Sequence, residues 1–311
     1  MCFASSGVLL VTWYSELLHL VDIEFSNLRR SGAIFPLFIK EEIASNFAEG
    51  DNEEELILHY VRLYASWKTK TPLGFLDCLG LYSAIINLQP SVIYLHTTNP
   101  TPFLFLNCEK LLDVTIKWPP IKTLVVTLHY VMNGQYIREI AHEADIYKLK
   151  AVEEYGGIVL DFDVLVINGS SLRNSLRSSE CVICYEDQYG PLIANGGLLG
   201  CREEHARFPQ LVLEESYKKN YHAGDWLYNS AILPWDIFQR HNDTATVLDG
   251  PCNHANGNWS GNYGTDNWTS LPAYHSYIHD AQARREKVLK WDSPVGEVAR
   301  WLLPGSFNLS G

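Results

Sequence analysis

Two aspartates in the middle of the chain, within the stretch IVLDFDVLVI, have a spacing that suits metal binding. If residues 158–167 form one strand, alternate side chains share a face, so Asp161 and Asp163 lie on the same side of it. Like charges on a buried face repel, and each is costly to desolvate alone. A divalent cation removes both difficulties, because carboxylate oxygens suit Mg²⁺ and Mn²⁺. The spacing therefore predicts a cation that is shared with a substrate diphosphate and neutralises charge on a departing nucleotide diphosphate.

The segment before this strand is expected to be a helix, Tyr136–Tyr155, that ends at the glycine pair 156–157. The first glycine is expected to take the left-handed conformation of a helix C-cap. His142 and Asp145 are spaced i, i+3 on one helix face, and Lys148 continues the row. We expect this row to face the strand and to contact the molecule that the cation holds. The alternative for His142 and Asp145 is a surface pair without such a role.

The rest of the chain alternates between strand-like and helix-like segments. Strands are expected within residues 56–65, 91–100 and 121–130, and a helix within residues 75–90. This alternation predicts an α/β fold with a mostly parallel central sheet and right-handed crossovers. Ligands of open parallel sheets gather at the carboxyl ends of the strands, which is where the two aspartates fall.

Two segments differ in composition from the rest. The acidic run Glu49–Glu55 predicts a solvated linker, so we expect an N-terminal extension and linker at residues 1–55 and one domain at residues 56–311. Beyond Pro251 the chain is rich in Asn, Gly and Trp, which is typical of a long loop, and such loops are often functional.

The overall charge and the N-terminus limit the partners. A net charge of -12 argues against a nucleic-acid partner and against adhesion to an anionic membrane. The uncharged N-terminal run stops at Glu16, short of the ~20 residues that span a bilayer, and lacks the basic region of a signal peptide. Membrane association is therefore expected only through an N-terminal anchor truncated from this sequence.

Five N-x-S/T sequons favour the secretory pathway. They begin at Asn168, Asn242, Asn258, Asn267 and Asn308.

Among the seven cysteines, Cys181 and Cys184 have C-x-x-C spacing. A zinc ribbon needs a second such pair, which the sequence lacks. The segment around them also predicts a strand, which would send the two side chains to opposite faces. The odd number of cysteines allows disulfides with one thiol left over.

The segment Ala144–Asp163 resembles the Asp-x-Asp sugar-binding region of glycosyltransferase family 32. This family includes fungal mannosyltransferases, animal α-1,4-glycosyltransferases and the glucosylating domains of clostridial toxins. The positions that match are Ala144, Asp145, Gly156, Gly157, Ile158, Asp161 and Asp163. Lys148 stands where the family has arginine, and it keeps the charge but not the planar fork. Weaker similarity extends over about residues 56–303, including the stretches LHYVRL, IANGGLLG, DWLYNS and PAYHSYIH.

This resemblance implies a GT-A fold, a nucleotide-sugar donor (most simply a UDP-sugar), and a Mn²⁺ or Mg²⁺ cofactor. It also implies transfer of a hexose, with retention, to a hydroxyl of a glycan or glycolipid in the Golgi or secretory lumen. Asp163 would bind the metal directly, and Asp161 would contact ribose and metal-bound water. His275 would lie near the diphosphate and complete the metal shell, for which a loop histidine without a ligand role is the alternative. The implied donor-binding positions are His142, Asp145, Lys148, Gly157, Val61 and Arg62. The implied acceptor-side positions are Asn195, Asp225 and Trp226, for the last of which a core aromatic is the alternative.

Two other functions stay open at this stage. A phosphatase of the haloacid-dehalogenase type also ends a strand with Asp-x-Asp, where the first Asp is a nucleophile and Mg²⁺ binds beside it. A catalytically inactive binding protein with a glycosyltransferase-like fold is the second, because Lys148 replaces the family arginine. Release of a nucleotide diphosphate, release of phosphate, or binding without product separates the three.

Overall fold

The computed structural model describes residues 55–65, 71–99, 104–186, 191–250, 252, 268–278, 280 and 283–303. The expected N-terminal extension and nearly all of the acidic linker lie outside these residues, as does most of the Asn- and Gly-rich loop after Pro251. The sequons at Asn258, Asn267 and Asn308 also lie outside them.

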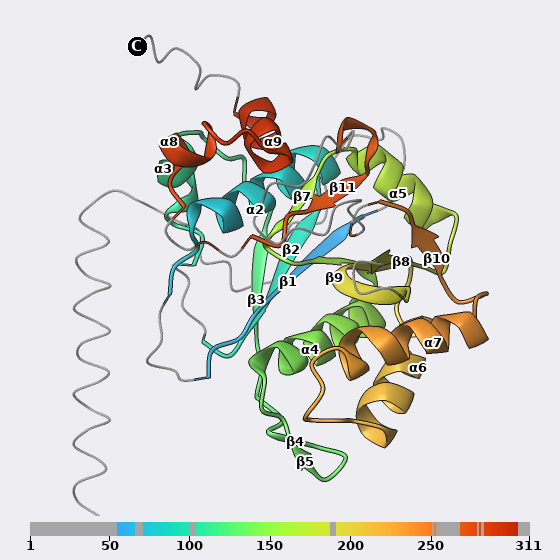
Figure 1. The fold of residues 1–311 in the computed structure, drawn as a ribbon. Helices are drawn as coiled ribbons and strands as arrows, with labels where there is room; N and C mark the ends of the chain where they lie inside the picture. Colours follow the sequence, from blue (N-terminus) through green and yellow to red (C-terminus); the bar gives the residue numbers. More distant parts are fainter. Residues whose placement is uncertain are drawn as a thin grey trace, which may run out of the picture. The chain divides into compact units, whose positions relative to one another are not determined.

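A seven-stranded sheet forms the centre of the described domain (Figure 1). The strand order is β10-β8-β9-β6-β1-β2-β3, and only β9 runs against the direction that the other six share. The expected α/β class with a mostly parallel sheet is therefore confirmed. The strands are β1 (Ile57–Arg62), β2 (Val92–Thr97), β3 (Ile121–Val125), β6 (Gly157–Leu160), β8 (Cys181–Glu186), β9 (Ile193–Cys201) and β10 (Thr246–Leu248).

Helices cover both faces of this sheet (Figure 1). On one face lie α2 (Phe75–Leu88), α3 (Cys108–Leu112), α5 (Gly169–Arg177), α8 (Arg285–Val288) and α9 (Pro294–Leu302). On the other lie α4 (Ile140–Tyr155), α6 (Arg207–Val212), η1 (Leu213–Lys219) and α7 (Leu233–Arg240). The segments η2 (Tyr228–Ile232) and η3 (Trp268–Ser270) are single helical turns. Successive β6 side chains alternate between the two cores, since Ile158 packs in the first and Val159 in the second.

The helix before the glycine pair begins later than the sequence predicts. Tyr136, the first residue expected in it, instead ends a hairpin of β4 (Val131–Met132) and β5 (Gln135–Tyr136), and α4 begins at Ile140. Asn133 and Gly134 at the hairpin tip have φ values of 46° and 72°. Positive φ at both central residues defines the two-residue turn that Asn-Gly favours.

The strand expected at residues 158–167 is interrupted at the aspartates. β6 ends at Leu160, and β7 (Val164–Val166) belongs to a separate two-stranded sheet with β11 (Ala273–His275). The turn between them is closed by the Val164 amide donating to the Asp161 carbonyl at 3.1 Å. The prediction that both aspartates lie on one face of a continuous strand is therefore wrong. They stand on either side of a turn.

Gly80 in α2 explains why the chain can turn there. A Cβ atom at Gly80 would lie 2.1 Å from the carbonyl oxygen of Phe162, the residue between the two aspartates. Only glycine allows the helix backbone to come so close. On the sheet side, the Asp161 amide donates to the carbonyl of Gly197 in β9 at 2.8 Å. The turn is thus held between α2 and β9.

Two disulfides join neighbouring elements of the described domain. Cys78 in α2 bonds Cys108 in α3, and Cys181 in β8 bonds Cys201 in β9. Cys181 packs in one core and Cys184 in the other, as the strand assignment predicts, so the C-x-x-C pair does not converge on a metal. Cys184 and Cys252 are buried thiols.

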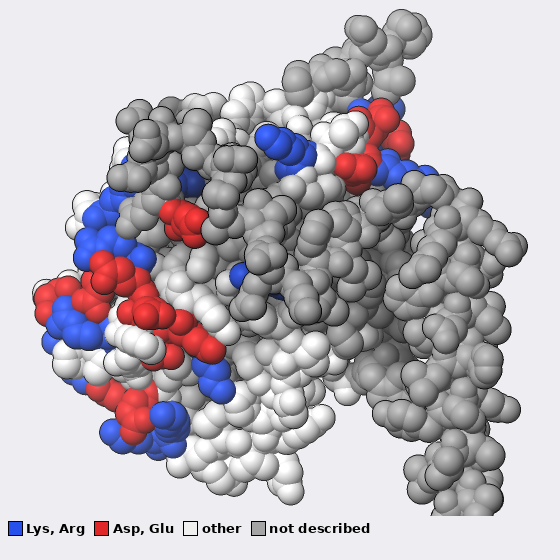
Figure 2. All heavy atoms as spheres, turned by 180° about the vertical axis from the view of Figure 1, so that it is seen from behind, with Lys and Arg blue, Asp and Glu red and all other residues white. Residues whose placement is uncertain are grey.

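Charged side chains of both signs are interspersed on the face shown in Figure 2. Among the described residues, two arginines each pair with two acids: Arg207 bonds Glu180 and Asp243, and Arg240 bonds Glu215 and Asp236. Exposed pairs of this kind contribute little to stability. Among the helices that the structure describes, none has the length and apolar character needed to cross a membrane.

Candidate functional site

The turn after β6 brings three potential metal ligands together. One atom each from Asp161, Asp163 and His275 lies within 4.8 Å of the other two. His275 ends β11, and its Nε2 atom is 3.2 Å from Oδ2 of Asp163. Asp163 and His275 are each 5% exposed, which distinguishes them from an ordinary cluster of surface acids. Two carboxylates and one imidazole form a donor set that suits Mn²⁺ or Mg²⁺ and leaves positions for a ligand's oxygen atoms.

The electrostatics of the three groups favour a cation. Burial alone would lower the pKa of His275, but the carboxylates of Asp163 and Asp161 outweigh burial and raise it. The two acids therefore favour positive charge at this position despite its burial. A divalent cation supplies that charge more fully.

His275 is positioned by contacts from three directions. Its strand pairs with β7, and the Ser276 amide donates to the Asp163 carbonyl at 2.9 Å. The ring of Tyr277 stacks on the imidazole with centroids 3.8 Å apart. On β9, a Cβ atom at Gly197 would lie 2.5 Å from Cε1 of His275. Glycine at position 197 therefore provides the space that the imidazole occupies.

Asn195 contacts the site through Tyr277. Its Nδ2 atom donates to the Tyr277 hydroxyl at 2.9 Å, and its Oδ1 atom accepts from the Gly197 amide at 2.8 Å. The Tyr277 hydroxyl in turn donates to Glu186 at 3.0 Å. Asn195 thus helps to fix the ring that stacks on His275, and its acceptor-side role stays a prediction.

Lys148 of α4 links the helix row to the turn. Its Nζ atom is 2.7 Å from Oδ1 of Asp161 and 3.1 Å from Oδ1 of Asp145. Burial would lower the pKa of Lys148, but the two carboxylates raise it above its usual value. Burial also raises the pKa of Asp145, although Lys148 opposes that shift. The expected convergence of this helix face on the turn is present for Asp145 and Lys148, and their sugar-binding roles stay predictions.

His142 lies on the same helix but contacts other groups. Its Nε2 atom donates to the Trp226 carbonyl at 3.2 Å, and its Nδ1 atom accepts from the Tyr221 hydroxyl at 2.9 Å. The side chain is 1% exposed, so the imidazole supports the segment that carries Trp226.

Trp226 is 56% exposed, and the alternative of a core aromatic is wrong. Asp225 accepts from the amides of Leu227 and Tyr228 at 3.1 Å each and so caps η2.

Val61 and Arg62 line a cavity of about 250 Å³ where the carboxyl end of β1 meets the start of α4. The Arg62 guanidinium lies 5.8 Å from the ring centroid of Phe162. The ring of Tyr60 stacks on Phe162 at 4.6 Å. The aromatic ring between the two aspartates is therefore fixed beside the cavity in which a nucleotide is expected. The sequence reading did not single out Phe162 or Tyr60.

Backbone conformation and close packing explain why residues 156 and 157 are glycines. Gly156 has φ +63° and ψ −161°, so its φ is positive as expected but its ψ lies outside the left-handed helical region. A Cβ atom at Gly157 would lie 2.3 Å from the carbonyl oxygen of Ile57. Close packing of β6 on β1 thus accounts for Gly157, whose donor-binding role stays a prediction. His59 Nε2 donates to the Gly156 carbonyl at 2.8 Å and fixes the turn.

No protein-family model matches the chain. The chain is similar to Glucan organizing enzyme 1 of Cryptococcus neoformans var. grubii, with 26% identity over 201 residues, or 61% of this chain. It spans about half the length of that relative, 51%.

Among solved structures, the chain is similar to the galactosyltransferase LgtC, with a TM-score of 0.45 and 13% identity, covering 78% of this chain and 95% of LgtC. It is also similar to the glycosyltransferase GlyE of Streptococcus pneumoniae TIGR4, with a TM-score of 0.45 and 14% identity, covering 81% of this chain and 63% of GlyE. Both are glycosyltransferases, which is the class that the sequence resemblance implies. At these identities the likeness concerns the fold alone, so the functional assignment depends on the residues of this chain.

Proposed function

We propose that this chain is a metal-dependent glycosyltransferase that moves a hexose from a UDP-sugar to a hydroxyl of a glycan or glycolipid, with retention of anomeric configuration. The observation that supports this most directly is the cluster of Asp161, Asp163 and His275 at the carboxyl end of a mostly parallel sheet. A second is the cavity beside Arg62, which is large enough for part of a nucleotide. The relative named for glucan organisation supports carbohydrate chemistry.

In this proposal Asp163 and His275 hold Mn²⁺ or Mg²⁺ directly, and Asp161 contacts the ribose and a metal-bound water. The bound cation supplies neutralisation of the negative charge on the departing diphosphate. Asp145 and Lys148 orient hydroxyls of the donor sugar from the helix side, 3.1 Å apart from one another. Retention is taken from the resemblance and implies either front-face departure and attack, which requires no nucleophile from the protein, or a covalent carboxylate intermediate.

We place this activity in the Golgi or the secretory lumen. Two disulfides in the described domain suit an oxidising compartment. Asn168 and Asn242, the first residues of two sequons, are exposed. Expression through the secretory pathway followed by glycan removal and mass spectrometry should show N-glycans at these two positions. Absence of both glycans from the secreted chain would contradict the placement.

The central test is metal-dependent UDP binding followed by a product assay. Thermal unfolding of the purified chain should shift upward with UDP and Mn²⁺ together, with a shift that grows with ligand concentration. Asp163→Asn should abolish UDP release from UDP-sugars and remove the metal-dependent part of the shift while leaving the fold intact. The matched control is Asp236→Asn, which alters an exposed aspartate of a surface ion pair.

The same assays distinguish the other two functions. Phosphate release from phosphomonoesters without UDP release would indicate a phosphatase. Nucleotide-sugar binding without release of UDP would indicate an inactive binding protein. Full transfer activity in the Asp163→Asn variant would refute the proposal.

A further inference from the structure

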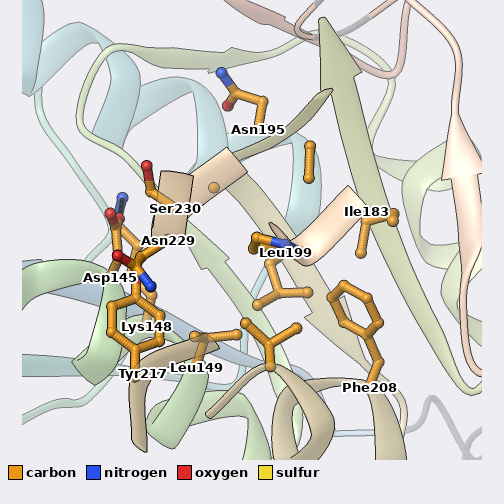
Figure 3. Close-up of a pocket in the computed structure, with 14 residues that line it drawn as sticks. Asp145, Lys148, Leu149, Ile183, Asn195, Leu199, Phe208, Tyr217, Asn229 and Ser230 are labelled. Atoms are coloured by element: carbon orange, nitrogen blue, oxygen red, sulfur yellow. Dashed lines mark hydrogen bonds and ion pairs between the residues drawn. The ribbon is translucent and has the colours of Figure 1, made fainter. Parts of the chain in front are cut away.

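A small pocket lies beside the Asp145–Lys148 pair, between α4, β9, α6 and η2 (Figure 3). Its volume is about 40 Å³. It is therefore too small for a sugar ring but large enough for a substituent of one. Because Asp145 and Lys148 are the proposed contacts to the donor sugar, such a substituent would extend directly from that sugar into the pocket.

The two sides of the pocket differ in chemistry. Figure 3 shows Asp145, Lys148 and Tyr217 together on one side and Ile183 and Phe208 on the other. The side chains of Leu199, Phe208 and Val212 complete an apolar floor that belongs to the second hydrophobic core. A ligand that fits must therefore carry an apolar end and a polar group close to it.

The polar side contains one hydroxyl without a bond. Tyr217 is 1% exposed, and among the described residues its hydroxyl has no hydrogen-bond partner. Burial and the nearby charge of Asp145 both raise the pKa of Tyr217, so the hydroxyl stays protonated and is a donor. By contrast, neighbouring Asn229 is fully engaged, donating to Ser216 and accepting from the His222 amide. A buried hydroxyl without a partner is costly, and such groups are rare unless a ligand or water completes them.

A methyl group next to a carbonyl oxygen matches both sides of the pocket. We propose that the pocket binds the acetamido group of the donor sugar, so that the donor is a UDP-linked N-acetylhexosamine. The acetyl methyl packs on Leu199, Phe208 and Val212, and the acetyl oxygen accepts a hydrogen bond from the Tyr217 hydroxyl. This inference rests on the proposed function, because it takes the donor sugar to lie against Asp145 and Lys148.

A water molecule is the competing occupant. It would find polar partners on the side of Asp145, Lys148 and Tyr217, but it would leave the apolar floor uncovered. A hexose with a plain hydroxyl at the same position would leave the floor uncovered. The acetamido group therefore uses the available surface more completely.

The test compares matched donors that differ only in this group. Binding of UDP-N-acetylglucosamine against UDP-glucose, and of UDP-N-acetylgalactosamine against UDP-galactose, is measured by calorimetry with Mn²⁺. At least one acetamido donor should bind about tenfold more tightly than its parent, from one hydrogen bond and one buried methyl group.

Tyr217→Phe is the diagnostic variant. It removes the hydroxyl alone, so the preference for the acetamido donor should fall about fivefold while the unfolding temperature stays equal or rises. Tyr94→Phe is the control, because it removes the hydroxyl of a tyrosine on β2 that bonds Lys122 and lies outside the pocket. Its acetamido preference should equal that of the unaltered chain. Ala194→Val, which narrows the pocket, should reduce the preference as well.

Failure of this inference differs from failure of the proposed function. Equal affinities within both donor pairs, with UDP binding still metal-dependent, would overturn the acetamido pocket and leave the glycosyltransferase assignment standing. An unchanged preference in Tyr217→Phe would likewise overturn it. If free N-acetylglucosamine, added with UDP and Mn²⁺, reproduces the preference while the donors do not, the group belongs to the acceptor and the inference is wrong. Absence of any UDP binding would overturn both.

Discussion

The Nζ atom of Lys148 lies 2.7 Å from Oδ1 of Asp161, and this contact joins the helix before the glycine pair to the turn after it. A lysine at this position, where the resembled family has arginine, reaches the Asp161 carboxylate at the turn and a second acid, Asp145, at 3.1 Å. It does so as a point charge with three donors on one nitrogen. The substitution therefore preserves the charge balance of the site and changes the geometry with which hydroxyls can be held.

Removing the lysine charge should destabilise the protein. Lys148→Met leaves Asp145 and Asp161 without their partner, and we expect the free energy of unfolding to fall by about 3 kcal/mol, measured by urea denaturation. Lys148→Arg keeps the charge and should retain most of that stability. Equal stability of the methionine variant and the unaltered chain would show that the acids do not depend on this contact.

The glycines of β9 provide a test of the metal site that leaves every ligand in place. In Gly197→Ala the new Cβ atom would meet His275 at 2.5 Å, so the imidazole must move and Mn²⁺ affinity should fall by at least about tenfold. Gly196→Ala is the matched control, because its Cβ atom would meet only Asp145 at 3.6 Å, an ordinary contact. Calorimetric titration with Mn²⁺ and UDP measures both. Similar affinities in the two variants would contradict the position given to His275.

Stability should decline in mild acid because of two buried histidines. His59 donates its Nε2 proton to the Gly156 carbonyl, so its Nδ1 atom accepts a hydrogen bond from Nε2 of His96 at 3.1 Å. In this arrangement both rings of the pair are neutral. Burial, and next to it the charge of His96, lowers the pKa of His59 to about 3, and burial lowers that of His96 to about 4.

Both folded pKa values lie below the ordinary value of 6.5, so the unfolded chain takes up protons first as the pH falls. Their contribution is complete above about pH 6.5 and is lost as the pH falls towards the folded values. Between pH 6 and 4 we expect each histidine to reduce the free energy of unfolding by about 1.4 kcal/mol per pH unit. Denaturation at a series of pH values measures this. His59→Gln and His96→Gln should flatten the dependence, whereas His205→Gln, at an exposed position, should not.

The disulfide between Cys181 and Cys201 should contribute measurably to stability. It closes a loop of 20 residues between β8 and β9, and β9 is the strand that carries Gly197. Replacing both cysteines with serine should lower the free energy of unfolding by about 3 kcal/mol, chiefly through the unfolded chain. Reduction of the unaltered chain breaks the Cys78–Cys108 bond as well and should lower the free energy of unfolding further. No change on removing the pair would show that the strands hold their register without it.

Much of this arrangement could be predicted from the sequence, because hydrophobic runs and glycines determine the conformation of the residues next to them. The central strands and the helix at residues 75–88 follow from apolar patterns. The hairpin at residues 131–136 was not predicted although Asn133-Gly134 is a strong turn signal, because its strands have two residues each and are too short to show an alternating pattern.

The break at the two aspartates could not be predicted from the strand itself. Its apolar alternation continues through Phe162, and what interrupts it is the backbone of α2 at Gly80 and the C-terminal strand that pairs with β7. Both contacts come from far along the chain. The meeting of Lys148 with Asp161 follows from that turn. The positions of Tyr217 and Tyr277 depend on packing that no short motif encodes.

The pairing of β7 with β11 also bears on how the protein is made. Asp163 and His275 are 112 positions apart, so a growing polypeptide carries both acids well before the imidazole emerges. During that interval Lys148, which contacts Asp161, is already synthesised. In the proposed metal site the third ligand therefore comes late in biosynthesis, and a product that stops short of β11 would carry the two acids without the imidazole.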